Sequence, residues 1–146
     1  MRSWSGYAAA ALSALALGVA ACKSAPTNGN NCGSGTPPDL TGSYLLSQYT
    51  LGTQSYTSPP SSGTLRLTGS AYAYSMDLTT GTGLPTVVHD SGTYQMIGAS
   101  CIRQVSALDT ILFSGSITLQ VAGGITTLRE SGTDGTHEVI WLWVKN

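Results

Sequence analysis

Tyr72-Ala73-Tyr74-Ser75-Met76-Asp77-Leu78 shows the clearest two-residue alternation in the chain. Large apolar and aromatic side chains occupy every second position, and small or polar side chains lie between them. Successive side chains of a strand point to opposite faces, so this pattern predicts a strand with one buried face.

Shorter alternations of the same kind fill the chain from residue 39 onward. They predict strands at residues 42–51, 64–68, 72–79, 87–88, 93–96, 101–105, 111–121, 125–129 and 137–144. Gly123-Gly124 and Asp134-Gly135 are hairpin-turn signals, whereas Pro59-Pro60 and residues 80–85 indicate loops. No stretch has the period of an amphipathic helix. We therefore expect an all-β domain over residues 39–146, an antiparallel barrel or sandwich of about eight strands.

The tripeptide Ser-Gly-Thr recurs at Ser62, Ser91 and Ser131, and Ser114-Gly115-Ser116 is similar. The unequal intervals exclude a solenoid repeat. We expect each copy at the start or end of a strand, where glycine allows the bulges and bends that a small barrel needs.

The last predicted strand is apolar on both faces. Val139, Trp141 and Trp143 share one face, and the other carries Ile140, Leu142 and Val144. The second face is either covered by a loop or by the N-terminal segment, or it is an apolar patch for a partner or ligand. We favour the covered strand.

Residues 1–21 have the pattern of a secretory signal peptide. Arg2 supplies positive charge, and residues 8–20 form an apolar run that only Ser13 interrupts. The run is too short and too rich in alanine for a typical membrane span of about 20 residues.

Val19-Ala20-Ala21-Cys22 resembles the lipobox of bacterial lipoproteins. The resemblance implies cleavage before Cys22, a thioether-linked diacylglycerol on its sulfur, and acyl chains such as palmitate that anchor the protein in the bacterial cell envelope. Lys23 follows the cysteine and favours the outer membrane, facing the periplasm or the cell surface. The alternative is an ordinary signal peptide that ends at Ala20.

Residues 22–38 are almost devoid of apolar side chains after the cysteine, so we expect a flexible tether. In an exported protein Cys32 and Cys101 tend to form a disulfide, worth about 4 kcal/mol in the chain-entropy model. Cys32 could instead remain free in the tether.

Only 9% of the residues are charged, and the formal net charge is −1. A nucleic-acid partner would need a basic stripe, so this composition argues against one.

Four features together resemble the lipocalin-like domains of bacterial lipoproteins: Gly42-x-Tyr44, the strand at residues 63–67, Ser91-Gly92-Thr93-Tyr94, and a last strand with two tryptophans. The resemblance implies a small up-and-down β-barrel. The chain departs from true lipocalins in having Tyr44 where they carry tryptophan, and in lacking a predicted C-terminal helix.

The residues suggest no enzyme, metal or cofactor site. His89-Asp90 and His137-Glu138 are adjacent pairs, whose side chains would point to opposite faces of a strand. Zinc needs three or four convergent ligands, so we expect both histidines at the surface or rim. Glu130 is interpreted as a surface partner of Arg129.

The sequence therefore favours two functions over a third, an enzyme, which is the weakest hypothesis. The first is a non-enzymatic binder of a small apolar or amphipathic ligand, with a site lined by Tyr72, Tyr74, Met76, Tyr94, Leu119 and Trp141. The second is a barrel with a filled interior that contacts another protein, as a periplasmic inhibitor or envelope accessory protein.

Overall fold

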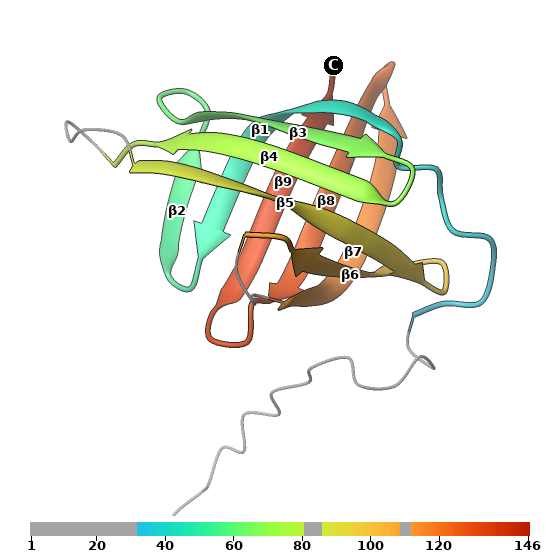
Figure 1. Cartoon of the computed structure of the whole chain (residues 1–146). Helices are drawn as coiled ribbons and strands as arrows, with labels where there is room; N and C mark the ends of the chain where they lie inside the picture. Colours follow the sequence, from blue (N-terminus) through green and yellow to red (C-terminus); the bar gives the residue numbers. More distant parts are fainter. Residues whose placement is uncertain (1–31, 81–85, 109–111) are drawn as a thin grey trace, which may run out of the picture.

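The computed structural model describes residues 32–80, 86–108 and 112–146 (Figure 1). These residues form nine β-strands and no helix, as the alternating pattern predicts. The strands are β1 (Gly42–Leu51), β2 (Gln54–Thr57), β3 (Ser62–Thr68), β4 (Ala71–Leu78), β5 (Thr86–Ile97), β6 (Cys101–Ser106), β7 (Leu112–Ala122), β8 (Ile125–Thr133) and β9 (Glu138–Lys145).

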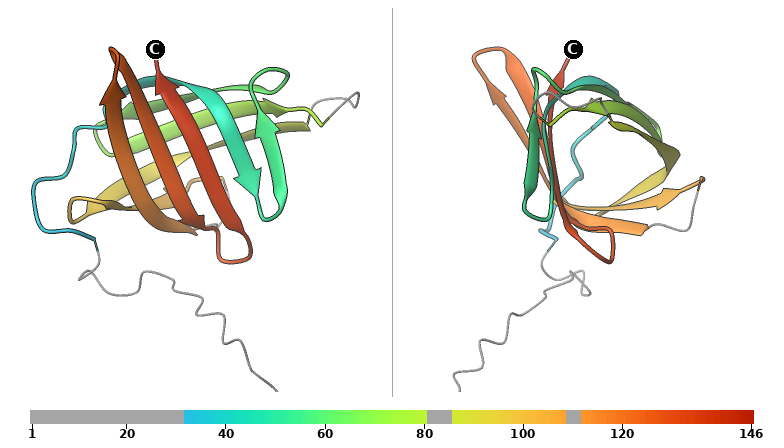
Figure 2. Two further views of the ribbon diagram at one scale, coloured as in Figure 1. Left: turned by 180° about the vertical axis from the view of Figure 1, so that it is seen from behind. Right: turned by 90° about the vertical axis from the view of Figure 1, so that its left-hand side faces the viewer.

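The sheet closes on itself as an antiparallel barrel. Each strand from β3 to β9 pairs with the next, while β1 pairs with β3 on one side and with β9 on the other. Eight strands thus form a lipocalin-like up-and-down barrel, and β2 is an additional strand that pairs with the second half of β1. Figure 2 shows the closed ring of strands.

The predicted inner face is confirmed in β4. Tyr72, Met76 and Leu78 are buried and Tyr74 is half-buried, while the residues between them are exposed. Inner residues of the other strands join them in one core, which includes Tyr44, Leu65, Leu128 and Trp143 at 0–2% exposure. The apolar side chains at every second position therefore form the core of the barrel.

The antiparallel order places successive turns at alternating ends of the barrel. The turns at residues 69–70, 98–100 and 123–124 lie at the same end as the start of β1 and the end of β9. The turns at residues 52–53 and 134–137 lie at the other end. We call these the strap end and the far end.

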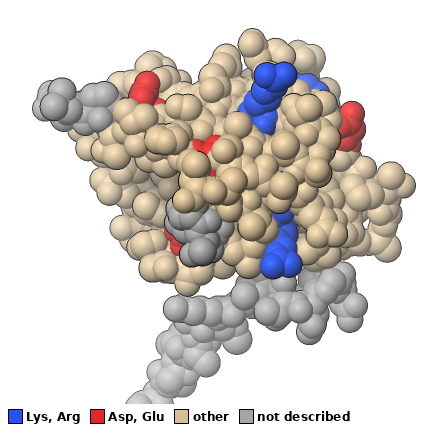
Figure 3. Space-filling view, in the orientation of Figure 1, with Lys and Arg blue, Asp and Glu red and all other residues tan. Residues whose placement is uncertain are grey.

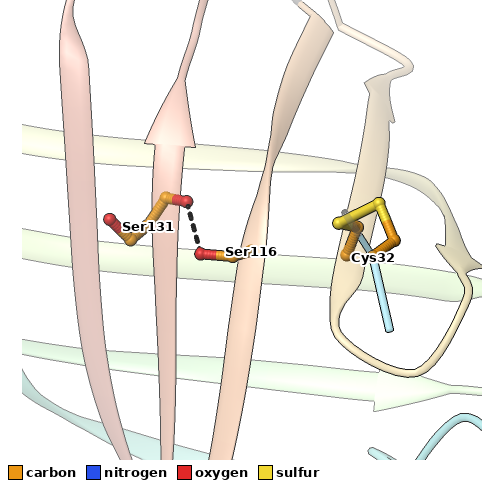
Figure 4. Close-up of a disulfide and its surroundings, with 4 residues drawn as sticks. Cys32, Ser116 and Ser131 are labelled. Atoms are coloured by element: carbon orange, nitrogen blue, oxygen red, sulfur yellow. Dashed lines mark hydrogen bonds between the residues drawn. A yellow bond between two sulfur atoms is a disulfide. The ribbon is translucent and has the colours of Figure 1, made fainter. Parts of the chain in front are cut away.

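Residues 32–41, the strap, precede β1 and are fixed to the strap end. Cys32 and Cys101 form the predicted disulfide (Figure 4). The amides of Ala99 and Ser100 donate to the carbonyls of Gly33 and Cys32 at 3.3 and 2.9 Å. The strap also contributes to the core, because Leu40 is 2% exposed and its carbonyl accepts a 2.7 Å hydrogen bond from the Tyr44 hydroxyl.

The recurring glycines allow strands to approach closely. A Cβ on Gly115 would lie 2.4 Å from the Ser131 carbonyl oxygen, and one on Gly132 would lie 2.2 Å from the Ser114 carbonyl oxygen. Ser116 Oγ donates to the Ser131 carbonyl at 3.3 Å beside this contact (Figure 4). The expectation that every copy lies at a strand end is wrong for Ser91 and Ser114, because Ser91-Gly92-Thr93 lies within β5 and Ser114-Gly115-Ser116 lies within β7.

Two strand predictions need correction. Residues 86–97 form one strand of 12 residues rather than two short strands, and β2 was not predicted. The alternation in β5 is obscured because Asp90 and Gly92 occupy inner positions opposite Tyr74 and Tyr72. The four residues of β2 are all exposed or half-buried, so they carry no apolar alternation.

The outer face of β9 is half-buried rather than fully covered. Ile140, Leu142 and Val144 lie between outer side chains of β8 and β1, and Leu142 is opposite both Arg129 and Gln48. The three inner residues of β9 are buried, as predicted.

Candidate ligand site in the barrel

The predicted ligand-binding residues all lie on inner positions of the barrel. Tyr72, Tyr74 and Met76 come from β4. Tyr94 lies on β5 opposite Gln104, Leu119 on β7 opposite Leu128, and Trp141 on β9 opposite Glu130.

These six residues differ in their exposure. Tyr72, Met76 and Trp141 are 4%, 1% and 6% exposed, whereas Tyr74, Tyr94 and Leu119 are half-buried. Tyr94 lies four residues along β5 from Asp90, the partner of Tyr74, which corresponds to about 13 Å at 3.3 Å per residue. The prediction therefore combines residues from two different levels of the barrel.

A continuous group of aromatic rings contains the buried tryptophan of this set. The Trp141 ring contacts Phe113 at 4.7 Å in an edge-to-face arrangement, Tyr49 at 5.8 Å and Tyr74 at 6.2 Å between centroids. Tyr49 stacks in turn on Tyr56 at 5.8 Å. Tyr74 continues the series to Tyr72 at 6.2 Å. We call these rings the aromatic cluster: Tyr49, Tyr56, Tyr72, Tyr74, Phe113 and Trp141.

The aromatic cluster has a buried centre and two half-buried members, Tyr56 and Tyr74. Burial raises the pKa of Tyr49 to about 12, with smaller contributions from the charges of Asp134 and Tyr56. The Tyr49 phenol therefore stays neutral at any physiological pH. The cluster can offer apolar ring faces to a ligand while its centre remains fixed by ring packing.

Sequence reasoning missed Tyr49 and Tyr56. Tyr49 faces inward because the register between β1 and β9 shifts between Leu46 and Gln48, a bulge that moves the inner face by one residue. Tyr56 lies on β2, which has no strand pattern of its own. The only signal in the sequence for Tyr49 and Tyr56 is that they are tyrosines, like three of the predicted residues.

The inner positions of β5 are less packed than those of its neighbours. Val88, Asp90, Tyr94 and Met96 are all half-buried, while the three inner residues of β6 are buried. The inner side chains of β5 therefore retain contact with solvent, as Tyr74 on β4 and Leu119 on β7 also do.

Asp90 holds a polar network on this wall. Its carboxylate accepts hydrogen bonds from the Tyr72 hydroxyl at 2.6 Å, the Ser106 hydroxyl at 2.6 Å and the Ser91 amide at 2.7 Å. The Leu108 amide donates to Ser106 at 3.1 Å, which connects the network to the segment after β6. The three donors orient the carboxylate and the Tyr72 ring.

Glu130 is buried in the interior, so its interpretation as a surface partner of Arg129 is wrong. It is 2% exposed, and Gln104 Nε2 lies 3.5 and 3.4 Å from its two carboxyl oxygens. Burial raises the pKa of Glu130 to about 7, and the hydrogen bond from Gln104 opposes the shift. The strand register explains the location, because Glu130 shares the inner face of β8 with Leu128.

Two further polar groups lie buried beside Glu130. Trp141 is directly opposite it on β9, and Trp143 is its diagonal neighbour. Neither indole N–H has a hydrogen-bond partner among the described residues. Both are donors, so a ligand or water that reaches them must present an acceptor oxygen or nitrogen.

The histidines do not form a metal site in the described part of the chain. Both are exposed, and His137 Nδ1 lies 3.6 Å from Asp134 Oδ2 in the β8–β9 turn. Among the described residues, no group of three or more histidine, cysteine or carboxylate side chains converges as metal ligands would.

The predicted signal peptide, Cys22 and residues 22–31 of the tether lie outside the described residues. No helix in the described ranges is long and apolar enough to cross a membrane. No protein-family model matches this chain, and neither a curated protein nor a solved structure matches it.

Proposed function

We propose that this chain is a lipid-anchored protein of the bacterial cell envelope whose barrel binds a small amphipathic ligand without catalysing a reaction. Residues 1–21 would serve as the signal peptide, and Cys22 would carry the lipid that anchors the protein, in the outer membrane. The ligand would lie at the far end of the barrel, against Tyr56 and Tyr74 and above Trp141.

The observation that carries this proposal is the form of the aromatic cluster. It connects half-buried Tyr56 and Tyr74 through direct ring contacts to Trp141, which is 6% exposed. Aromatic side chains with a buried base and accessible edges are typical of small-molecule sites, because ring faces bind apolar groups at low cost in conformational entropy.

The polar groups of the interior favour an amphipathic ligand over a purely apolar one. Asp90 is half-buried on β5, directly opposite Tyr74. Its hydroxyl donors, Tyr72 and Ser106, are buried beside it on β4 and β6. The indole N–H groups of Trp141 and Trp143 are also buried. A ligand with an apolar body and an oxygen-bearing head group would match both kinds of surface.

Titration of the full chain with a dansyl-labelled fatty acid tests the ligand proposal. We expect saturable energy transfer from tryptophan to dansyl, because a bound probe would lie within a few ångströms of Trp141. An unlabelled amphiphile should reverse the signal by competition. A linear, non-saturating response would contradict binding in the barrel.

Mass spectrometry of the mature protein tests the anchor separately. The expected product begins at Cys22 and carries two or three acyl chains, and a Cys22→Ala chain should carry none. A mature N-terminus at residue 21 without acyl mass would indicate an ordinary signal peptide.

A protein partner is the second candidate, and the exposed apolar side chains of the far end favour it. Val105 and Leu112 are cross-strand neighbours that are 44% and 37% exposed, and Leu108 between these strands is 60% exposed. A stoichiometric envelope partner whose binding is lost in Leu108→Ser but retained in Ile125→Ser would support this function over ligand binding.

A further inference from the structure

The described basic residues gather toward the strap end of the barrel. Arg66 and Arg103 each lie three residues from a strap-end turn, and Lys145 ends β9 there. Arg129 lies farther along β8. All four side chains are exposed. Asp39 is the one acidic residue at this end among those described, and the Lys145 ammonium donates to the Thr41 carbonyl at 2.9 Å.

Acidic residues occupy the far half of the barrel. Asp77 lies next to the end of β4, Asp90 lies on the far half of β5, and Asp134 and Glu138 flank the β8–β9 turn. Figure 3 shows the basic side chains on the right half of the visible face, toward the strap end, and most acidic ones on the left. The described barrel is thus positive at one end and negative at the other, although the net charge of the chain is only −1.

Exposed apolar side chains occur at both ends and do not distinguish them. Val121 and Ile125 at the β7–β8 turn are 71% and 57% exposed, while Val87 and Leu108 at the far end are 61% and 60% exposed. The strap end therefore combines exposed apolar tips with positive charge, and the far end combines them with negative charge.

The length of chain between Cys22 and the strap also limits how far the barrel can lie from residue 22. Ten peptide units separate Cys22 from Cys32, and a fully extended chain of that length spans at most about 36 Å. Cys32 is held at the strap end by the disulfide and by the hydrogen bond from the Ser100 amide. A lipid on Cys22 would bring this end of the barrel toward the bilayer.

We propose that the strap end is a docking surface for an anionic bilayer, with Arg66, Arg103 and Lys145 contacting lipid phosphates and the β7–β8 turn touching the interface. The charge complementarity selects this partner, because each basic side chain near an anionic membrane strengthens binding about fivefold. The acidic far end, with Tyr49, Tyr56 and Phe113 of the aromatic cluster, would then face away from the membrane.

The orientation of the barrel rests on the proposed lipid at Cys22, whereas the affinity of the strap end for anionic lipid does not. A Cys22→Ala chain therefore separates the two ideas. Its partition is measured at about 0.1 M salt, where screening limits electrostatic effects to about 10 Å, into phosphatidylcholine vesicles and into vesicles with about a third phosphatidylglycerol. The ratio of the two partition coefficients cancels the apolar contribution of residues 1–21.

In this background, Arg66→Gln with Arg103→Gln should lower the ratio roughly 25-fold, about fivefold for each charge. Neither side chain has an ion pair or hydrogen bond among the described residues, so the fold should be unaffected. The matched control is Asp77→Asn with Glu138→Gln, which also changes the net charge by two but at the far end, and should change the ratio less than about twofold.

An unchanged ratio in the double arginine variant would overturn the docking surface, whatever the state of Cys22. A rise in the control as large as the fall in the arginine variant would also overturn it, because net charge rather than the strap end would then govern binding.

Discussion

The two ends of the barrel are built differently. At the strap end residues 32–41 extend from the β5–β6 turn to the start of β1, a disulfide fixes them, and Leu40 enters the core at 2% exposure. At the far end no comparable segment packs among the described residues, and Tyr56 and Tyr74 remain half-buried above Trp141. We therefore expect the strap end to contribute more to stability, while the proposed ligand site lies at the far end.

Among these tests of the two ends, removing the disulfide should cause the largest change in the free energy of unfolding. Cys32→Ser with Cys101→Ser frees a chain segment of 69 residues, which should lower the free energy of unfolding by about 4 kcal/mol. Urea denaturation followed by tryptophan fluorescence measures the change. Cys22→Ser is the matched control, since it removes the third cysteine, and with it the proposed lipid, but no bridge. An equal midpoint for both variants would mean that the strap end needs no covalent closure.

Truncating Leu40, the strap side chain that enters the core, should have the next largest effect. Leu40→Ala removes a buried side chain, and we expect a loss of about 3 kcal/mol in unfolding free energy. Leu51→Ala removes the same atoms from a half-buried position near the far end and should cost about 1 kcal/mol. The reverse order, measured by urea denaturation, would show that the far end is the better packed one.

The buried Glu130 carboxyl, between the two ends, should make the free energy of unfolding depend on pH. Burial raises the pKa of Glu130 from 4.5 to about 7, so the folded state holds a proton that the unfolded chain releases. Stability from this group is complete below pH 4.5 and is lost as the pH rises to about 7, on the order of 3 kcal/mol in total.

Glu130→Gln should remove that loss, and its stability relative to the natural protein should increase from pH 4.5 to pH 8. Burial also raises the pKa values of Tyr44 and Tyr94, which lie near Glu130. These two phenols therefore stay neutral between pH 4.5 and pH 8 and do not contribute to the change. Urea denaturation at several pH values provides the measurement. A difference between the two proteins that does not vary with pH would place the Glu130 carboxyl in contact with water.

The smallest effect concerns the ligand directly. Tyr74→Ala should weaken binding of the dansyl-labelled fatty acid about tenfold, because it removes a ring that contacts both Trp141 and Tyr72. Tyr94→Ala removes the same group on the strap-end half of β5 and should change the Kd less than about threefold. If Tyr94→Ala has the greater effect, the site lies beneath the strap instead.

The sequence was sufficient for the architecture wherever one face of a strand is apolar. Residues 72–78 alternate without interruption, so their inner face could be assigned directly. The same rule fails in β5, where Asp90 and Gly92 take inner positions, and in β2, which has no buried side chain. Closure between β1 and β9 joins the two ends of the barrel sequence, and local alternation cannot specify such a long-range pairing.

The candidate site was predicted less well, for two physical reasons. The bulge in β1 moves Tyr49 to the inner face, and a periodic pattern cannot reveal where a bulge occurs. Glu130 follows Arg129, and adjacent opposite charges usually indicate the surface; its alternation with buried Leu128 was the signal that could have placed it inside. The hydrogen bond from Gln104, 26 residues earlier, depends on the closed barrel.

The most direct test of the account uses a spin-labelled fatty acid and the amide signals of the folded protein. Paramagnetic broadening should be strongest at Tyr56 and Tyr74, and weak at Tyr94 and Leu119. Broadening centred on Tyr94 and Leu119, or spread evenly over the barrel, would contradict a ligand site at the far end.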